Sequence, residues 1–324
     1  MKFKFAVLLS LCALSSCGED EKIEMAPSVE VVKKQQYHVA NKVLFSKEGD
    51  LCISRFLSIL PIPQSNEYQE VSNVKMSNGN VLEDENYGNK ICYYEADSFD
   101  MSSFTFSTEF DVTPISMRID LSKIKEIKPY DLSNYEVQRH LGDRGEYIQT
   151  SNPYIKNTGD SIWNKSKDVL DYARKCYEHV ASKFKYINGN FRTLAQTLSD
   201  GGGECGDLTT LVVNLLRYKN IPSRHIICLR LDRGYHVWAD FYLEEYGWIP
   251  FDVTYKNSNP SGDYFGYYDG ACVVMSKDLD YTYGVDLPSS ISFLQTYYYW
   301  YWWYTGYGTI SSRHLVTSKK QVSQ

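Results

Sequence analysis

One cysteine in this sequence stands where a thiol could act as a nucleophile. Residues 201–213 read GGGECGDLTTLVV, so Cys205 follows three glycines and an acid and begins a run of apolar residues at helical spacing. A thiolate is favoured by the unpaired N–H groups of a helix N-terminus and by a cationic histidine. The same N–H groups could stabilise an oxyanion, and the glycines would leave room for a substrate. Taken alone, the stretch fits equally well a plain turn before a buried cysteine.

A general base, and a group to orient it, are available in the strands expected after this helix. Of the six histidines, His236 opens the strand candidate HVWADFYL, whereas His225 lies inside the apolar run RHIICLRL and is expected in the core or at the surface. Asp252, in the run GWIPFDVTY, could hold the imidazole ring and stabilise the imidazolium. Cys205, His236 and Asp252 are therefore the candidate catalytic residues.

Strand geometry sets a condition on this triad. Alternate residues of a strand share a face, so His236 and Trp238 point the same way. Asp252 joins them if it pairs opposite Trp238, which a three-residue loop between the strands would give, and its carboxylate would then lie diagonal to His236. A four-residue loop without a bulge would point Asp252 to the other face.

The elements that must position these residues differ between the two halves of the chain. Residues 31–150 contain short β-prone runs separated by turn signals, a pattern typical of an antiparallel β-sandwich. Residues 151–324 contain an amphipathic stretch at 165–184, a short helical piece and the helix that starts at Cys205, followed by three strands. The predicted fold class is α+β. Cys176 and His179, on the first of these helices, are interpreted as packing or surface residues.

Residues 1–17 have the features of a lipoprotein signal peptide. Lys2 and Lys4 precede an apolar stretch that is too short to span a bilayer, and the segment ends in LSSC, which resembles a bacterial lipobox. We therefore expect lipid modification of Cys17, a polar linker at 18–30, and an exported protein anchored to a membrane of the cell envelope. The alternative is an ordinary cleaved signal with an incidental cysteine.

Composition and cysteine spacing argue against several other classes. The net charge is -6 without a long basic run, so no nucleic-acid partner is expected. Cys205 lacks the closely spaced ligands of a metal site, the acidic residues at 278–280 are too few for a calcium site, and no cofactor is expected. The cysteines are too sparse for a disulfide scaffold. Cys52 and Cys92 could pair or could be separately buried thiols.

The stretch from GGGECGDLTTLVV to HVWADFYLEEYGWIPFDVTY resembles the core of the transglutaminase-like superfamily, over roughly residues 165–256. The shared pattern is a cysteine at a helix start, a histidine opening a strand, and an aspartate after a Gly-Trp turn. The resemblance implies a papain-like α+β fold with Cys205 as nucleophile, His236 as base and Asp252 as its orienter. It also implies acyl transfer through a thioester, with bacterial members resembling peptidases or amidases more often than cross-linking enzymes.

Several alternatives stay open at this point. The expected substrate is a peptide or protein with a glutamine-type carboxamide or a peptide bond, and cell-wall material or polysaccharide is a further candidate. The rival interpretation is a non-catalytic protein- or polysaccharide-binding module that keeps the fold. Gln196 is a candidate second oxyanion donor, although a surface role is favoured. The aromatic run at 296–308 could be a binding platform, and a strand or loop covering the catalytic module is favoured. The oligomeric state is undetermined.

Overall fold

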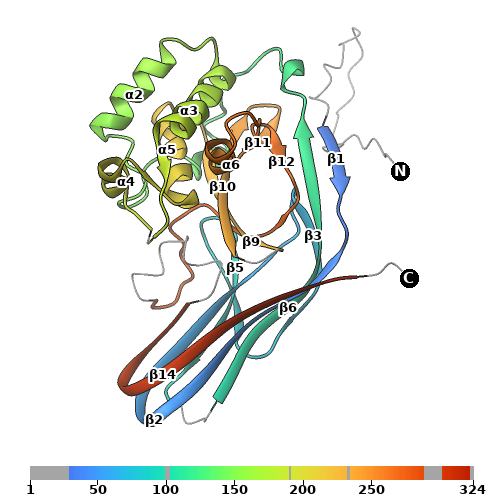
Figure 1. Ribbon diagram of the computed structural model, residues 1–324, viewed down its shortest axis with the longest axis vertical. Coiled ribbons are helices and arrows are strands. Elements are labelled where there is room, and N and C mark those ends of the chain that lie inside the picture. Colours follow the sequence, from blue (N-terminus) through green and yellow to red (C-terminus); the bar gives the residue numbers. More distant parts are fainter. Residues whose placement is uncertain (1–28, 99–102, 190, 232–233, 288–300, 322–324) are drawn as a thin grey trace.

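The computed structural model describes residues 29–98, 103–189, 191–231, 234–287 and 301–321. It confirms the α+β class. A large curled sheet extends through the lower and right-hand parts of Figure 1, and the helices gather at the upper left beside a smaller sheet. The predicted signal peptide and Cys17 lie outside the described residues. None of the helices in the described part is long and apolar enough to cross a membrane.

The large sheet has eight strands, joined by antiparallel pairing into one hydrogen-bonded layer. They are β1 (Val29–Lys33), β2 (Tyr37–Ile62), β3 (Gln69–Met76), β4 (Asn80–Glu83), β5 (Lys90–Ala96), β6 (Ser103–Ile119), β12 (Tyr267–Tyr268) and β14 (Tyr301–Lys320). The alternating run SFTFSTEF places Phe104 and Phe106 in a buried cluster on one face, as a half-buried strand requires. The β-rich, antiparallel character expected for the first half is confirmed, and the strands curl as a single sheet.

The last strand corrects the expectation for the aromatic C-terminal stretch. Residues 301–320 do not cover the helical part. They form β14, which pairs antiparallel with β2 from Tyr301 opposite Ile59 to Lys320 opposite Tyr37. The ring of Trp302 packs against Phe45 in the apolar cluster of the large sheet. Trp302 and Tyr304 therefore complete the apolar cluster of the large sheet, whereas Tyr307 is exposed. Residues 296–300 lie outside the described residues.

A four-stranded antiparallel sheet, in the order β11-β10-β9-β13, forms the floor beneath the helices. Its strands are β9 (Ser223–Arg230), β10 (Tyr235–Leu243), β11 (Gly247–Phe251) and β13 (Cys272–Lys277), and β7 (Lys185–Tyr186) with β8 (Gly202–Gly203) makes a short parallel pair. The helices are α1 (Tyr135–Gln138), α2 (Pro153–Trp163), α3 (Val169–Lys183), α4 (Leu194–Asp200), α5 (Cys205–Tyr218) and α6 (Val253–Ser258), with a 3₁₀ turn at Leu121–Lys123. Helix α5 is buried from Cys205 to Arg217, because its apolar residues pack against β9 and β10 and its other sides meet α2, α3 and α6.

Polar side chains tie the small sheet to the large one. The amide of Gln69, at the start of β3, donates to the Val274 carbonyl at 2.8 Å and accepts from the Val274 N–H at 2.7 Å. Next to it, the Tyr68 hydroxyl donates to Asp240 on β10 at 2.9 Å, and Asp240 also accepts two bonds from Arg224 on β9. Because these groups are buried and fully paired, they fix the strand that carries the candidate base.

Several elements differ from the sequence prediction, among them β13, a fourth strand of the small sheet where three were expected. The run GWIPFDVTY, expected as one strand, stops being a strand at Phe251, and Asp252 becomes the N-cap of α6. Helix α2 was not predicted. It starts with Asn152 as its cap and Pro153 at its first position, a pairing that suits a helix N-terminus.

The cysteines described here are separate thiols. Cys92 is buried on β5 opposite Leu60, and its Sγ donates to the Asn78 carbonyl at 3.0 Å. Cys52 is exposed farther along β2. The sequence left open whether Cys52 and Cys92 form a disulfide or are separately buried thiols. The structure shows two separate thiols, of which Cys92 is buried and Cys52 is exposed.

Candidate active site

The three glycines before Cys205 each meet a different structural demand. Gly201 has φ +68° and ends α4 in the left-handed conformation that glycine adopts without strain. A Cβ on Gly202 would lie 2.0 Å from the Lys185 carbonyl oxygen of the paired strand, and a Cβ on Gly203 would lie 2.4 Å from Oδ2 of Asp207. The expectation that the glycines keep space for a substrate is therefore corrected: at Gly202 and Gly203 the space is filled by the protein itself.

This close packing holds the first turn of α5 in place. Oδ2 of Asp207 accepts from the N–H of Glu204 at 2.9 Å, and Oδ1 accepts from the N–H of Arg192 at 3.0 Å. Cys205 is the first residue of the helix, with 3% of its surface exposed. In the described part of the chain its N–H has no acceptor, so this donor and the positive end of the helix are available beside the sulfur.

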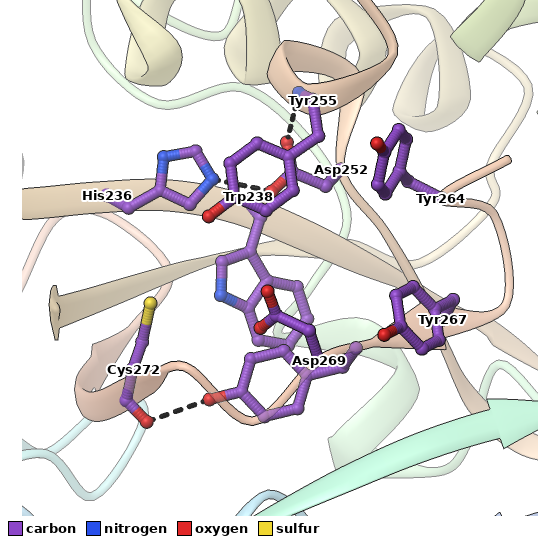
Figure 2. Close-up of a pocket in the computed structure, with 9 residues that line it drawn as sticks. His236, Trp238, Asp252, Tyr255, Tyr264, Tyr267, Asp269 and Cys272 are labelled. Atoms are coloured by element: carbon purple, nitrogen blue, oxygen red, sulfur yellow. Dashed lines mark hydrogen bonds and ion pairs between the residues drawn. The ribbon is translucent and has the colours of Figure 1, made fainter. Parts of the chain in front are cut away.

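Pairing of β10 with β11 satisfies the geometric condition set by the sequence. Leu243 pairs with Gly247, which leaves a three-residue loop, and Ala239 pairs with Phe251. The next step of this register places Asp252 opposite Trp238, on the face that His236 shares. Oδ2 of Asp252 lies 2.5 Å from Nε2 of His236, and Figure 2 shows the two side chains pointing toward each other.

Asp252 is held by a second bond that the sequence did not reveal. Its Oδ1 accepts from the N–H of Tyr255 at 2.9 Å, which caps α6. One carboxylate therefore starts a helix with one oxygen and holds the imidazole with the other. Because the cap fixes the carboxylate, the direction of its bond to His236 is fixed as well.

His236 is buried, with 4% of its surface exposed. Burial alone would lower the pKa of its imidazole, but the charge and hydrogen bond of Asp252, together with the thiol of Cys205, raise it well above the usual value. The thiol of Cys205 lies close enough to the ring to contribute to this shift of its pKa. Since Nε2 is bonded to Asp252, Nδ1 is the nitrogen left for the thiol. The structure thus brings Cys205, His236 and Asp252 together in the order sulfur, imidazole, carboxylate.

A pocket with aromatic walls adjoins the His236–Asp252 pair, on β10, α6 and the segment that leads into β13 (Figure 2). Its lining combines five aromatic residues, two carboxylates, a cysteine and the imidazole: His236, Trp238, Asp252, Tyr255, Tyr264, Tyr267, Tyr268, Asp269 and Cys272. Among the aromatic residues that line the pocket, Tyr255 and Trp238 are nearest to the pair in sequence. The sequence did not predict that either residue lines a pocket, because the lining residues come from separate segments and share no sequence motif.

The other candidates from the sequence lie elsewhere. Cys176 is fully buried in α3, and Nε2 of His179 bonds to a tyrosine hydroxyl at 3.1 Å. Gln196 is exposed, and its side chain accepts from the N–H of Thr193 at 2.9 Å to complete a capping box for α4. Gln196 is therefore engaged at the surface in capping α4, in line with the favoured interpretation.

A buried charged cluster lies beneath α5, and no motif in the sequence pointed to it. Arg217, in the last turn of α5, donates two bonds to Asp278, and Nδ1 of His140 lies 2.6 Å from the same carboxylate. All three are essentially inaccessible to solvent, and Nε2 of the buried His225 bonds to Thr210 nearby at 2.9 Å. The cluster is a structural anchor for α5. In the described residues, no group of three or more histidines, cysteines or acids is arranged to hold a metal ion.

Comparisons with known proteins bear on the family and the fold. Residues 156–253 match the family model of the transglutaminase-like superfamily core. An uncharacterized protein of Haemophilus influenzae is 23% identical over 237 residues, which cover 60% of this chain and 62% of that protein's length. A crystal structure of a candidate cysteine protease from Cytophaga hutchinsonii superposes with a TM-score of 0.64 at 13% identity, covering 91% of this chain and 94% of that one, and so shares the fold. The periplasmic domain of TgpA from Pseudomonas aeruginosa gives a TM-score of 0.36 at 11% identity, over 69% of this chain and 91% of that chain.

Proposed function

We propose that the part of the chain at residues 156–253, which matches the family model of the transglutaminase-like superfamily, is a cysteine-dependent acyl-transfer enzyme acting on a carboxamide or peptide bond. The observation that carries the proposal is the arrangement of Cys205, His236 and Asp252. A thiol at a helix start, an imidazole whose pKa is raised, and a carboxylate held by a helix cap are the parts that nucleophilic catalysis by cysteine requires.

The reaction follows from the positions of these groups. The proton of the Cys205 thiol passes to Nδ1 of His236, and the thiolate attacks the carbonyl carbon to form a C–S bond. The N–H of Cys205 donates to the oxyanion that develops. His236 then gives its proton to the leaving amine as the C–N bond breaks, which leaves a thioester. Water or a second amine, deprotonated by His236, attacks the thioester and frees the thiol.

Selective alkylation tests this proposal without knowledge of the substrate. Iodoacetamide at neutral pH should modify Cys205 faster than Cys52, although Cys205 is buried and Cys52 is exposed. The ordering reverses the one expected from exposure alone, because a thiolate paired with an imidazolium reacts faster than a neutral thiol. Peptide mass spectrometry after short labelling times resolves the two sites, and His236→Ala should slow the reaction at Cys205 alone.

The opposite ordering would support the rival interpretation, a binding module with the same fold. If Cys205 reacts more slowly than Cys52, and only when the protein is unfolded, the enzyme proposal is wrong. A positive result leads to a second step, in which envelope extracts are incubated with the protein and the acyl group on Cys205 is identified by mass spectrometry. That group defines the substrate, and the products separate hydrolysis from transamidation.

We further propose that the protein is exported and attached to an envelope membrane through a lipid on Cys17. The support is the sequence alone: two lysines, a short apolar stretch and LSSC. Growth with an alkyne fatty acid should label the wild-type protein and fail to label Cys17→Ala. Labelling of both, or of neither, contradicts the proposal.

A further inference from the structure

Tyr255 contacts both members of the His236–Asp252 pair from a single position in α6. Its N–H donates to Oδ1 of Asp252 at 2.9 Å, and its ring stacks on the imidazole of His236 with a centroid separation of 4.9 Å and an angle of 11° between the planes. Figure 2 shows the ring of Tyr255 beside the imidazole, with the bonds from Tyr255 and His236 converging on Asp252. No other aromatic side chain described here stacks on His236.

The far end of Tyr255 is anchored as well. Nη1 of Arg230, on the last residue of β9, donates to the Tyr255 hydroxyl at 3.1 Å. Tyr264 packs edge-on against the same ring at 5.5 Å. The ring is therefore fixed at its backbone, at its hydroxyl and along its edge, so it presents a rigid face to the imidazole.

We propose that Tyr255 is a positioning residue for the candidate base, and that the face of its ring holds His236 in place and favours the imidazolium. This inference rests on the function proposed above. A cation over an aromatic face is attracted by the ring's quadrupole, and the attraction grows when both partners are desolvated. His236 is buried, so the contact is made where water competes least. The stack also blocks rotation of the imidazole away from the thiol.

Other charged and titratable groups lie around His236 or around Tyr255, and the experiment must separate them from the ring. They are Cys205 on α5, Cys228 and Arg230 on β9, Asp252 before α6, and Asp269 and Cys272 on the approach to β13 and its first residue. Tyr255→Leu keeps the N–H that bonds to Asp252 but loses the hydroxyl that accepts from Arg230. Tyr255→Phe loses the same hydroxyl, so the difference between the two variants isolates the ring.

The test is an NMR titration of His236 in the full chain carrying carbon-13-labelled histidine, with the signal assigned through His236→Gln. An attraction of about 0.5–2 kcal/mol between the imidazolium and the aromatic face corresponds to a rise of about 0.4–1.5 units in the pKa of His236. Tyr255→Leu should lower the pKa of His236 by that amount. Tyr255→Phe keeps the aromatic face and loses the bond to Arg230. In that variant the pKa of His236 should stay close to the wild-type value.

Tyr267→Leu is the matched control, because Tyr267 is a half-buried tyrosine that lines the same pocket and does not stack on His236. Its titration should equal that of the wild type. The proposal is overturned if Tyr255→Leu titrates like Tyr267→Leu, or if Tyr255→Phe shifts the pKa as far as Tyr255→Leu. Should Tyr255→Leu not fold, Tyr255→Met takes its place. The titration does not depend on whether Cys205 reacts, so it fails or succeeds separately from the alkylation experiment.

Discussion

A single methyl group added at adjacent glycines should have very different effects. In Gly201→Ala the new Cβ meets nothing within 4 Å, so the cost is the left-handed backbone alone, about 1–2 kcal/mol. In Gly202→Ala the new Cβ would lie 2.0 Å from the Lys185 carbonyl oxygen, a backbone atom that cannot turn aside. The strands β7 and β8 must then separate.

The magnitude at Gly202 follows from the bonds that this separation breaks. Two backbone bonds flank the contact, from Lys185 N–H to the Gly201 carbonyl at 3.0 Å and from Ile187 N–H to the Gly203 carbonyl at 2.9 Å. Each contributes about 0.5–1.5 kcal/mol, and the overpacking adds about 1–3 kcal/mol. We expect Gly202→Ala to lower the free energy of unfolding by about 2–6 kcal/mol.

Urea unfolding followed by tryptophan fluorescence measures both variants. Gly202→Ala should also change the rate at which Cys205 is alkylated, because β8 leads directly into α5, whereas Gly201→Ala should leave that rate near the wild-type value. If Gly202→Ala is no less stable than Gly201→Ala, the reasoning is refuted, and the glycines would have to serve the access of substrate after all.

Three further changes test the rest of the structure. Asp252→Asn should lower the pKa of His236. Because that pKa is raised in the folded protein, the lost stability should be greatest below about pH 6.5 and should vanish as the pH rises through the folded-state value, which urea unfolding at several pH values will show. Asp278→Asn leaves Arg217 buried without its partner and should cost about 3–5 kcal/mol at pH 7; an unchanged urea midpoint would contradict the role assigned to this cluster. Removing residues 301–324 exposes an edge of β2, so the shortened protein should aggregate or dimerise on size-exclusion chromatography, and a stable monomer would count against the role of β14.

The sequence predicted those features of the structure that are set by residues close to one another along the chain. The apolar spacing after Cys205 predicted α5, and strand alternation predicted which loop length would bring Asp252 to His236, a condition that the structure meets. Both follow from the periods of helix and strand, which act over a few residues. The end of β11 at Phe251 was missed because a cap at Asp252 competes with a strand pattern that continues through VTY.

Long-range contacts set the limit of that approach. Nothing near Arg217 indicates that its partner is Asp278, and nothing near Trp302 indicates that its strand pairs with β2. Tyr255 was hidden for the same reason, since its stacking on His236 is produced by the turn from β11 into α6. Residues that act through such long-range contacts have no characteristic spacing in the sequence by which they could be recognised.

The pairing of β14 with β2 has a consequence for the order in which the protein can be built. Strand β2 is made near the start of synthesis, and the chain that supplies its partner follows every other described element. Until then β2 has an open edge, although β5 and β6 already cover the other side along parts of its length. Closing so large a loop is slow, and an open edge invites pairing with other chains. A chaperone that shields nascent strands would therefore matter most before the last residues are synthesised. By then the segment with the thiol and the imidazole is already complete.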